Sequence, residues 1–390
     1  MKKAKVVIGS AYGDEGKGVI TDYLSSQDEE SIVIRFNGGA QAGHTVVTPD
    51  GKRHVFGHFA SNSFLPNATT VLSEFFVVNP LLFKKEKQAL ENFGVNPTVF
   101  IHEDAYITTP FEMILNQWVE DSRGANRHGS CGVGFGETIA REEVGGITFK
   151  MKDISNRDLL LSVRNYFLQR VKELGLEDVL SSNRFLIEDS FIDKFYDDLI
   201  KILADVKQFS NKLPDSNNIV FEGAQGLLLD QKFGFFPHVT RSNTGLKNVV
   251  SLSKKYNIDT LDVFYASRCY STRHGAGPLK NALNNKPYKG ITDLTNIPNQ
   301  YQGNLRFAYL DLDILKSTID VDKESVNAVL DGINVNTNIG ITCLNQSEEI
   351  IFYYNNILHK EKNKDFTKFL SDIFYLNVLG GWTGTRDGFK

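Results

Sequence analysis

The sequence has few cysteines, no long apolar run and no secretion signal. Its 390 residues include only Cys131, Cys269 and Cys343, spaced more than 70 residues apart. This odd number and wide spacing exclude a disulfide framework and a cysteine metal site, and are typical of a reducing cytoplasm. No stretch of about 18 uncharged apolar residues occurs, and the lysine-rich first residues lead directly into an apolar strand. We therefore expect a cytoplasmic protein with no membrane partner.

An excess of basic residues is also absent. The chain has 43 Lys and Arg against 47 Asp and Glu, which gives a net charge of -4. A mildly acidic chain binds polyanions poorly, so we expect no nucleic-acid partner. Apolar residues make up 41% of the chain and aromatic residues 11%. That is enough to form a large buried core, and it excludes a disordered or collagen-like chain.

Short apolar runs alternate with segments of helical periodicity along the whole chain. The runs predict buried strands at residues 6–8, 32–34, 99–101, 219–221 and 263–265. Apolar stripes predict core-facing helices within residues 159–171, 191–203 and 366–374. Ser155 and Asp158 predict a capping box at the start of the first of these helices. With no repeat or linker, we expect an α/β fold, with residues 1–390 forming a single domain around a mostly parallel sheet with helical insertions.

Glycine-rich loops follow several of these strands, where ligands bind in parallel sheets. The first runs from Gly9 to Gly18 and precedes a helical segment. A strand, a glycine loop, Lys17 and a helix form a P-loop-like phosphate cradle. Gly18 replaces the Ser or Thr that holds Mg²⁺ in the usual P-loop. Asp14 lies inside this anion site, which is costly unless the carboxylate binds a metal or takes a proton.

Three further loops contain groups suited to a nucleotide. The loop 37–45 places His44 among small residues, where a histidine can donate to a phosphoryl oxygen during transfer. The loop 129–136 and the segment 221–226, which continues to 237–244, are dense in hydroxyl and amide groups. Such groups suit the edge of a base and a phosphate. Together the loops predict a nucleotide site.

In this order, the motifs resemble those of the adenylosuccinate synthetase family. The resemblance is specific at GDEGKG (13–18), GG-x-x-AGHT (38–45) and FEGAQG (221–226). It is also good at residues 239–244 and 270–278, so it covers most of the chain between residues 6 and 311.

The resemblance implies a two-step carbon–nitrogen ligase of purine biosynthesis. The γ-phosphoryl group of a nucleoside triphosphate moves to O6 of an inosine-type nucleotide, and the amino group of L-aspartate then displaces it. Asp14 would be the base that removes the purine N1 proton, and His44 the acid that stabilises the transferring phosphoryl group. Asp14 and the Gly43 carbonyl would bind Mg²⁺, the expected cofactor. These roles agree with the importance of positioning and electrostatics in phosphoryl transfer.

The resemblance also assigns residues to the two nucleotides. The triphosphate would contact Gly13, Glu15, Gly16, Lys17, Gly18, Thr45 and Arg306. The purine monophosphate would contact Asp14, Gln41, Ser130, Cys131, Arg141, Gln225 and Thr240. Arg141 matches an arginine that reaches across the interface of a homodimer to the nucleotide phosphate, so we expect a homodimer.

The sequence departs from the family pattern at two places. One arginine, Arg306, stands in the segment 299–311 where the family has several that bind aspartate and ribose. The family's Lys-Leu-Asp guanine reader corresponds to Val326-Asn327-Ala328, which has no carboxylate. The expected triphosphate is therefore ATP or dATP as well as GTP. The expected partners are L-aspartate and one of IMP, dIMP, GMP or dGMP.

Two alternatives remain open. A phage-type relative would join aspartate to dGMP with ATP or dATP, and such a protein would act in the host cytoplasm. Those relatives have a small residue at the position of Asp14, which speaks against this reading. A non-catalytic nucleotide-binding switch is the second alternative. The chain lacks the Asn-Lys-x-Asp guanine motif of such switches and carries both a base and an acid.

Overall fold

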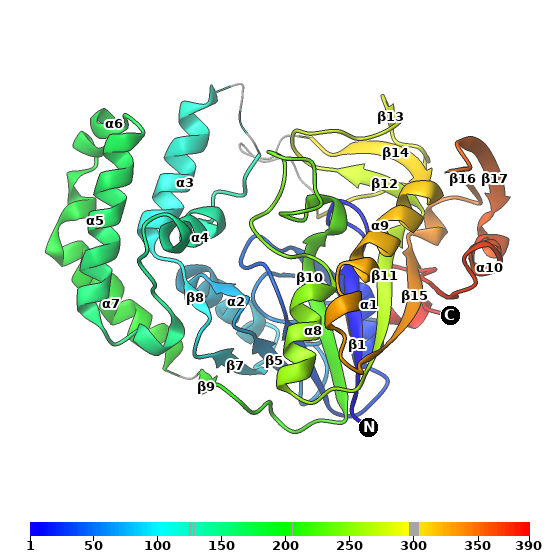
Figure 1. Cartoon of the computed structure of the whole chain (residues 1–390), viewed down its shortest axis with the longest axis horizontal. Coiled ribbons are helices and arrows are strands. Elements are labelled where there is room, and N and C mark those ends of the chain that lie inside the picture. The colour runs from blue at the N-terminus through cyan, green and yellow to red at the C-terminus, as the bar shows by residue number, and fades with distance from the viewer. Residues whose placement is uncertain (125–126, 128, 205, 296–303) are drawn as a thin grey trace.

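The structure, a computed structural model, describes residues 1–124, 127, 129–204, 206–295 and 304–390. At its centre is a nine-stranded sheet in which every strand pair is parallel (Figure 1). In spatial order the strands are β18 (Asn377–Gly380), β15 (Asn334–Thr342), β11 (Thr260–Arg268), β1 (Lys3–Gly9), β10 (Asn218–Gly226), β2 (Ser31–Arg35), β5 (Thr69–Leu72), β7 (Thr98–His102) and β9 (Lys207–Phe209). The expected α/β fold around a mostly parallel sheet is confirmed.

The five expected strands are all present, in β1, β2, β7, β10 and β11. Their apolar side chains are buried because helices cover the central strands on both faces. Strand β15 was not predicted from the sequence, because its first half, Asn334 to Asn338, is mostly polar and partly exposed. The helices that pack around the centre of the sheet are α1 (Lys17–Ser25), α8 (Leu246–Lys255) and α9 (Leu312–Glu324). Helix α10 (Asn363–Phe374) packs against the edge strand β18 and the neighbouring strands of a smaller sheet.

A lobe of helices stands beside the β5–β9 side of the sheet and has a core of its own (Figure 1). It contains α2 (Pro80–Glu91), α3 (Pro110–Ser122), α4 (Phe135–Glu143), α5 (Arg157–Glu173), α6 (Glu177–Ser181) and α7 (Asp189–Leu203). The expected helical insertions are thus confirmed. The capping box was wrong by one residue, because the side chain of Asn156, not Ser155, accepts the N–H of Asp158 at the start of α5.

A smaller sheet and two strand pairs complete the fold. The smaller sheet contains β12 (Tyr270–Arg273), β13 (Ala282–Leu283), β14 (Arg306–Asp311), β16 (Glu349–Tyr354) and β17 (Ile357–Lys362). The strand pairs are β3 (His44–Val47) with β4 (Arg53–Phe56), and β6 (Val77–Val78) with β8 (Tyr106–Ile107). No helix in the described part of the chain is long and apolar enough to cross a membrane. That residues 1–390 form one domain stays a prediction.

Candidate active site

The loop that follows β1 lies where four parallel strands end together. Gly9 pairs with Gly226 of β10 and with Ala266 of β11, and Arg268 of β11 pairs with Thr342 of β15. The hydroxyl of Thr342 donates to the carbonyl of Glu15 over 2.9 Å, which ties the end of β15 to the loop. This is the carboxyl edge of the sheet, where parallel sheets bind their ligands.

The loop is an anion cradle filled by a carboxylate of its own. Glu15 is buried and accepts the N–H groups of Ala11 and Gly13 over 3.0 and 2.8 Å. The Lys17 ammonium donates to Glu15 over 2.9 Å and to the Gly13 carbonyl over 2.7 Å. Gly16 begins helix α1 at φ 83°, a left-handed conformation that favours glycine. A phosphate bound here would take over donors that now contact Glu15, so the triphosphate contacts assigned to Glu15, Lys17 and the loop glycines stay predictions.

His44 lies next to this cradle, and its imidazole contacts a buried glutamate. A Cβ at Gly18 would stand 3.0 Å from the Cβ of His44, so helix α1 and strand β3 are in close contact. Nδ1 of His44 lies 2.7 Å from Oε1 of Glu222 in β10. Glu222 also accepts the hydroxyl of Ser61 and its N–H, the latter over 3.1 Å, and lies 3.8 Å from Nε of Arg35.

The pKa values of this buried pair diverge. Burial alone would raise the pKa of Glu222, but His44 and Arg35 outweigh it and hold that pKa at about 2. Burial lowers the pKa of His44 to about 4, although Glu222 opposes the shift. His44 is therefore neutral at neutral pH, and Glu222 is ionised.

Asp14 belongs to the loop of the cradle itself, and among the described residues fewer side chains contact its carboxylate than contact that of Glu222. Burial raises the pKa of its carboxyl group, and Arg268 and His274 oppose the shift. Arg268 donates to the backbone carbonyl of Asp14, while Nε2 of His274 lies 3.8 Å from Oδ2 of Asp14. Burial raises the pKa of the Cys131 thiol to about 11, and the charge of Asp14 adds to that rise. The loop that carries Cys131 therefore lies close to Asp14.

The other residues assigned to the purine nucleotide surround the same loop. Gln225 has φ 64°, and its side-chain oxygen would stand 3.4 Å from a Cβ at Gly13. Both amide atoms of Gln41 are buried without a hydrogen-bond partner among the described residues. The hydroxyl of Ser130 accepts from Asn116 over 2.9 Å, and Thr240 is partly buried. The motif FEGAQG was expected as a loop, but it forms the end of strand β10, with Gln225 in a left-handed turn.

Three assigned residues have other partners in this structure. Arg141 is fully buried and contacts Oε1 of Glu112 at 2.9 Å, so its guanidinium points into its own subunit. A contact from Arg141 to a nucleotide in a second subunit stays a prediction, and it would require this pair to open. Arg306 donates to the carbonyls of Gly275 and Gly277. Thr45 shares a 2.7 Å hydrogen bond with Thr295.

The expected position of the guanine reader was wrong. Residues 326–328 follow α9 and precede β15, and Asn334 at the start of β15 pairs with Thr260 at the start of β11. They therefore lie at the amino end of the sheet, opposite the phosphate loop. The segment after β15, from Cys343 to Gln346, is the one that adjoins the loop, through Thr342. The register was missed because the polar start of β15 does not resemble a buried strand.

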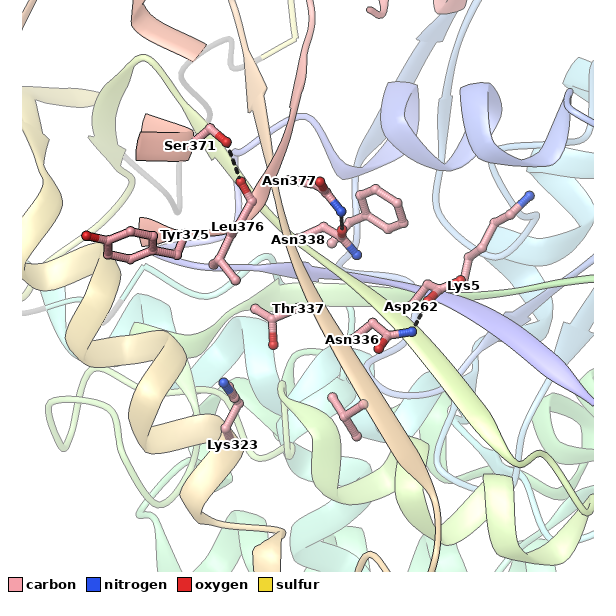
Figure 2. A pocket seen from close by; sticks show the side chains of 12 residues that line it. Lys5, Asp262, Lys323, Asn336, Thr337, Asn338, Ser371, Tyr375, Leu376 and Asn377 are labelled. Atoms are coloured by element: carbon pink, nitrogen blue, oxygen red, sulfur yellow. Dashed lines mark hydrogen bonds between the residues drawn. The ribbon is translucent and has the colours of Figure 1, made fainter. Parts of the chain in front are cut away.

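Sequence reasoning also missed several residues that contact Asp14 or the pair of His44 and Glu222. Arg35, Ser61, Arg268 and His274 received no role, and Glu222 was quoted only as part of a motif. One signal was available, because a glutamate inside an apolar strand needs a buried cationic or hydrogen-bonding partner. A groove of about 880 Å³ lies along β11 and β15. Figure 2 shows the side chains that line it, none of which belongs to this site.

A sequence model of the adenylosuccinate synthetase family matches residues 6–341. The adenylosuccinate synthetase of Mesoplasma florum is 31% identical over 331 residues, which are 80% of this chain and 73% of that protein. That of Borrelia duttonii is 29% identical over 337 residues, 81% of this chain and 74% of that protein.

The chain belongs to the adenylosuccinate synthetase family.

Solved structures show the same fold. Fully ligated adenylosuccinate synthetase from Plasmodium falciparum superposes with a TM-score of 0.73 at 19% identity, and 99% of each chain is covered. The succinoaminodeoxyadenylate synthetase of cyanophage S-2L, bound to dGMP and to dATP as an energy donor, gives a TM-score of 0.65 at 14% identity, covering 100% of this chain and 95% of that one. At such identities the likeness concerns the fold alone.

Family membership confirms the main functional expectation. Adenylosuccinate synthetases are carbon–nitrogen ligases of purine biosynthesis, so this chain is an enzyme that joins aspartate to a purine nucleotide. A non-catalytic nucleotide-binding switch is not favoured.

Proposed function

We propose that the protein transfers the γ-phosphoryl group of a nucleoside triphosphate to O6 of a purine monophosphate and joins L-aspartate at C6. One observation carries this proposal. The loop before α1 that forms the anion cradle contains a carboxylate, Asp14, and the helix that follows it contacts a histidine, His44. This arrangement supplies a base, a phosphate site and a donor to a moving charge at one edge of the sheet.

Asp14 and His44 would act in sequence in this reaction. A raised pKa suits Asp14 to take the N1 proton of the purine, which makes O6 the nucleophile for the phosphoryl group. His44 is neutral in this structure, with a pKa of about 4. The negative charges of a bound triphosphate raise the pKa of a neighbouring imidazole. We propose that His44 gains its proton only in that complex, and then donates to the transferring group.

Magnesium fits this site as a partner of the nucleotide. No group of three or more His, Cys, Asp or Glu side chains that could hold a metal ion occurs among the described residues. Mg²⁺ in nucleotide sites uses one or two carboxylates together with phosphate oxygens and water. Asp14 supplies such a carboxylate beside the cradle, and the Gly43 carbonyl is exposed on the loop before His44. The ion would neutralise phosphate charge during the transfer.

We propose an inosine-type monophosphate as the substrate that receives aspartate. Asp14 is present at the position where dGMP-using relatives have a small residue, and a carboxylate there leaves less room for a 2-amino group. A thermal-shift panel with IMP, dIMP, GMP and dGMP, each with and without L-aspartate, tests this. The largest stabilisation should come from IMP or dIMP. Greater stabilisation by dGMP than by either would favour the phage-type reaction.

The triphosphate is proposed to be ATP or dATP rather than GTP alone. The segment after β15 presents amide groups, with Asn345 exposed and Gln346 bound to the Tyr270 hydroxyl over 2.7 Å. Residues 343–347 contain no carboxylate. A guanine needs an acceptor for both its N1–H and its 2-amino group, which one carboxylate supplies. Without it GTP loses on the order of 1.5–3 kcal/mol of binding, whereas an amide can pair with adenine.

Comparing kcat/KM for ATP and GTP at a fixed monophosphate concentration tests this proposal. ATP or dATP should support the reaction at least as well as GTP. The matched variant Asn345→Asp should raise kcat/KM for GTP by about tenfold or more, as expected for a gain of at least 1.4 kcal/mol. A preference of the wild-type enzyme for GTP of tenfold or more would contradict the proposal.

We also propose that the enzyme is a homodimer. Three phenylalanines of one surface loop are exposed, Phe233, Phe235 and Phe236, the last with 87% of its area accessible. Exposed apolar side chains of this size are typical of protein interfaces. Light scattering coupled to size-exclusion chromatography should give twice the mass of the 43.8 kDa chain. A monomer mass at enzyme concentrations that support full activity would exclude the dimer.

A further inference from the structure

His274 lies at the candidate active site, and the proposed reaction gives it no role. It directly follows β12, and its Nε2 lies 3.8 Å from Oδ2 of Asp14. Its Nδ1 is buried and has no hydrogen-bond partner within the described part of the chain. A buried polar atom left without a partner costs about 1–3 kcal/mol. An unpartnered ring nitrogen beside the proposed base therefore indicates that a substrate group pairs with it.

The loop that carries His274 is held in place by two arginines. Arg306 donates to the carbonyls of Gly275 and Gly277 over 2.7 and 2.9 Å. Arg273 donates to the Pro278 carbonyl over 2.7 Å and stacks on the ring of Tyr12 at 4.4 Å. These contacts occupy the arginines with backbone groups and hold the backbone that follows His274.

The neighbour of Nε2 decides what Nδ1 offers. Until it takes the N1 proton, the ionised carboxylate of Asp14 only accepts hydrogen bonds. While L-aspartate binds in that state, Asp14 favours the tautomer of His274 that carries its proton on Nε2. Nδ1 then presents a lone pair. The substrate group that pairs with Nδ1 must therefore be a hydrogen-bond donor.

The reaction brings one such donor to this place. Asp14 contacts N1 of the purine in the proposed reaction, and C6 is the adjacent ring atom. The amino group of L-aspartate must reach C6, and it carries N–H donors. We propose that Nδ1 of His274 accepts a hydrogen bond from this amino group and orients its nitrogen toward C6. This inference rests on the proposed function.

The covalent step leaves His274 unchanged. The nitrogen–C6 bond forms, and the bond between C6 and the phosphorylated oxygen breaks. The phosphate leaves with the bonding electron pair. The amino group, which begins as an ammonium, releases two protons, of which one ends on the departing phosphate and the other enters water. His274 acts by orientation, through contact with the substrate.

Two matched variants test the proposal, because they place an amide at different ring positions. In His274→Asn the side-chain amide reaches the place of Nδ1, whereas in His274→Gln it reaches the place of Nε2. His274→Gln should lower kcat/KM for L-aspartate by about tenfold or more, the effect of losing one hydrogen bond of about 1.4 kcal/mol. His274→Asn should stay within about threefold of the wild type. The KM values for both nucleotides should not change in either variant.

Three results would overturn the inference. Equal losses in the Asn and Gln variants would show that the position of the amide does not matter. An unchanged kcat/KM for L-aspartate in both variants, and in His274→Ala, would show that no contact exists. Loss of phosphoryl transfer measured without L-aspartate, by isotope exchange, would show that His274 acts through Asp14. Binding of the monophosphate to each variant verifies that the site is folded.

Failure of the proposed function would look different. The wild-type enzyme would then release no phosphate with any combination of the nucleotides and L-aspartate, and both proposals would fall. If the wild type is active and the variants behave as in any of the three results above, only the role of His274 is wrong.

Discussion

Two carboxylates near the phosphate cradle, Glu222 next to His44 and Asp14 next to His274, differ in how completely they are paired. Glu222 accepts hydrogen bonds from the imidazole of His44 and from the N–H and hydroxyl of Ser61, and it lies beside Arg35. Among the described residues, the carboxylate of Asp14 lies 3.8 Å from the imidazole of His274, and the charges of Arg268, His274 and Lys17 oppose the effect of burial on its pKa. A saturated buried network fixes its members in one geometry. An undersaturated one leaves groups available, and a substrate can complete it.

The difference also appears in the pKa values. The partners of Glu222 hold its pKa at about 2 despite its burial, so this carboxylate is ionised and held in one position. The pKa of Asp14 is raised, because its partners do not offset its burial. Glu222 is therefore suited to positioning a histidine, and Asp14 to exchanging a proton. Four predictions test this contrast.

Removing the charge of Asp14 should have the largest effect on turnover. Asp14→Asn cannot accept the N1 proton and binds a metal ion poorly, so kcat should fall by about 10²–10⁴-fold, the range for loss of a general base. Steady-state kinetics measures this, and nucleotide binding by calorimetry should persist as the control. A variant that retains more than about a tenth of wild-type kcat, a loss below ~1.4 kcal/mol, would exclude the role.

Removing the charge of Glu222 should have the largest effect on stability. Glu222→Gln leaves Arg35 buried without its counter-charge, which typically costs about 3–5 kcal/mol of unfolding free energy. Urea unfolding measures the loss. The double variant Arg35→Met/Glu222→Gln should recover part of it, because no uncompensated charge remains. Additive losses in the double variant would show that the two groups do not interact.

Loss of the imidazole should affect the transfer step. His44→Ala should slow phosphoryl transfer by about 10²-fold or more, the scale for losing one donor to a developing charge. Rapid-quench measurement of triphosphate cleavage in single turnovers isolates this step. If only the KM for the triphosphate rises, His44 binds the nucleotide without stabilising the transfer.

The smallest expected effect is a gain in stability. Asp14→Asn removes a partly buried, poorly paired charge, and should raise the unfolding free energy at neutral pH by about 1 kcal/mol. The pKa of Asp14 is higher in the folded than in the unfolded chain, so the wild type loses stability as pH rises from about 4 through the folded value. The gain should therefore vanish below about pH 4. A gain that is equal at pH 3.5 and pH 7.5 would have another cause.

Much of this protein follows from its sequence. Buried strands such as 6–8 and 219–221 are recognisable because a strand covered on both faces needs a continuous apolar run. The order strand, glycine loop, Lys17 and helix predicts an anion cradle from local geometry alone. The family resemblance added the assignments of Asp14, which is part of the loop that forms the cradle, and of His44, which contacts the start of helix α1.

The tertiary structure decided the rest, because it depends on contacts between residues far apart in the sequence. The pairing of His44 with Glu222 spans 178 residues, and the contact of Thr342 with the phosphate loop spans 327. The second contact places the end of β15, and not residues 326–328, beside the phosphate loop, which is why residues 343–347 are proposed to read the base. Tertiary packing also turned Arg141 of α4 inward to Glu112 of α3, and it brought His274, which follows β12, to Asp14. Local patterns specify which elements form, and only packing specifies which polar groups are left for a substrate.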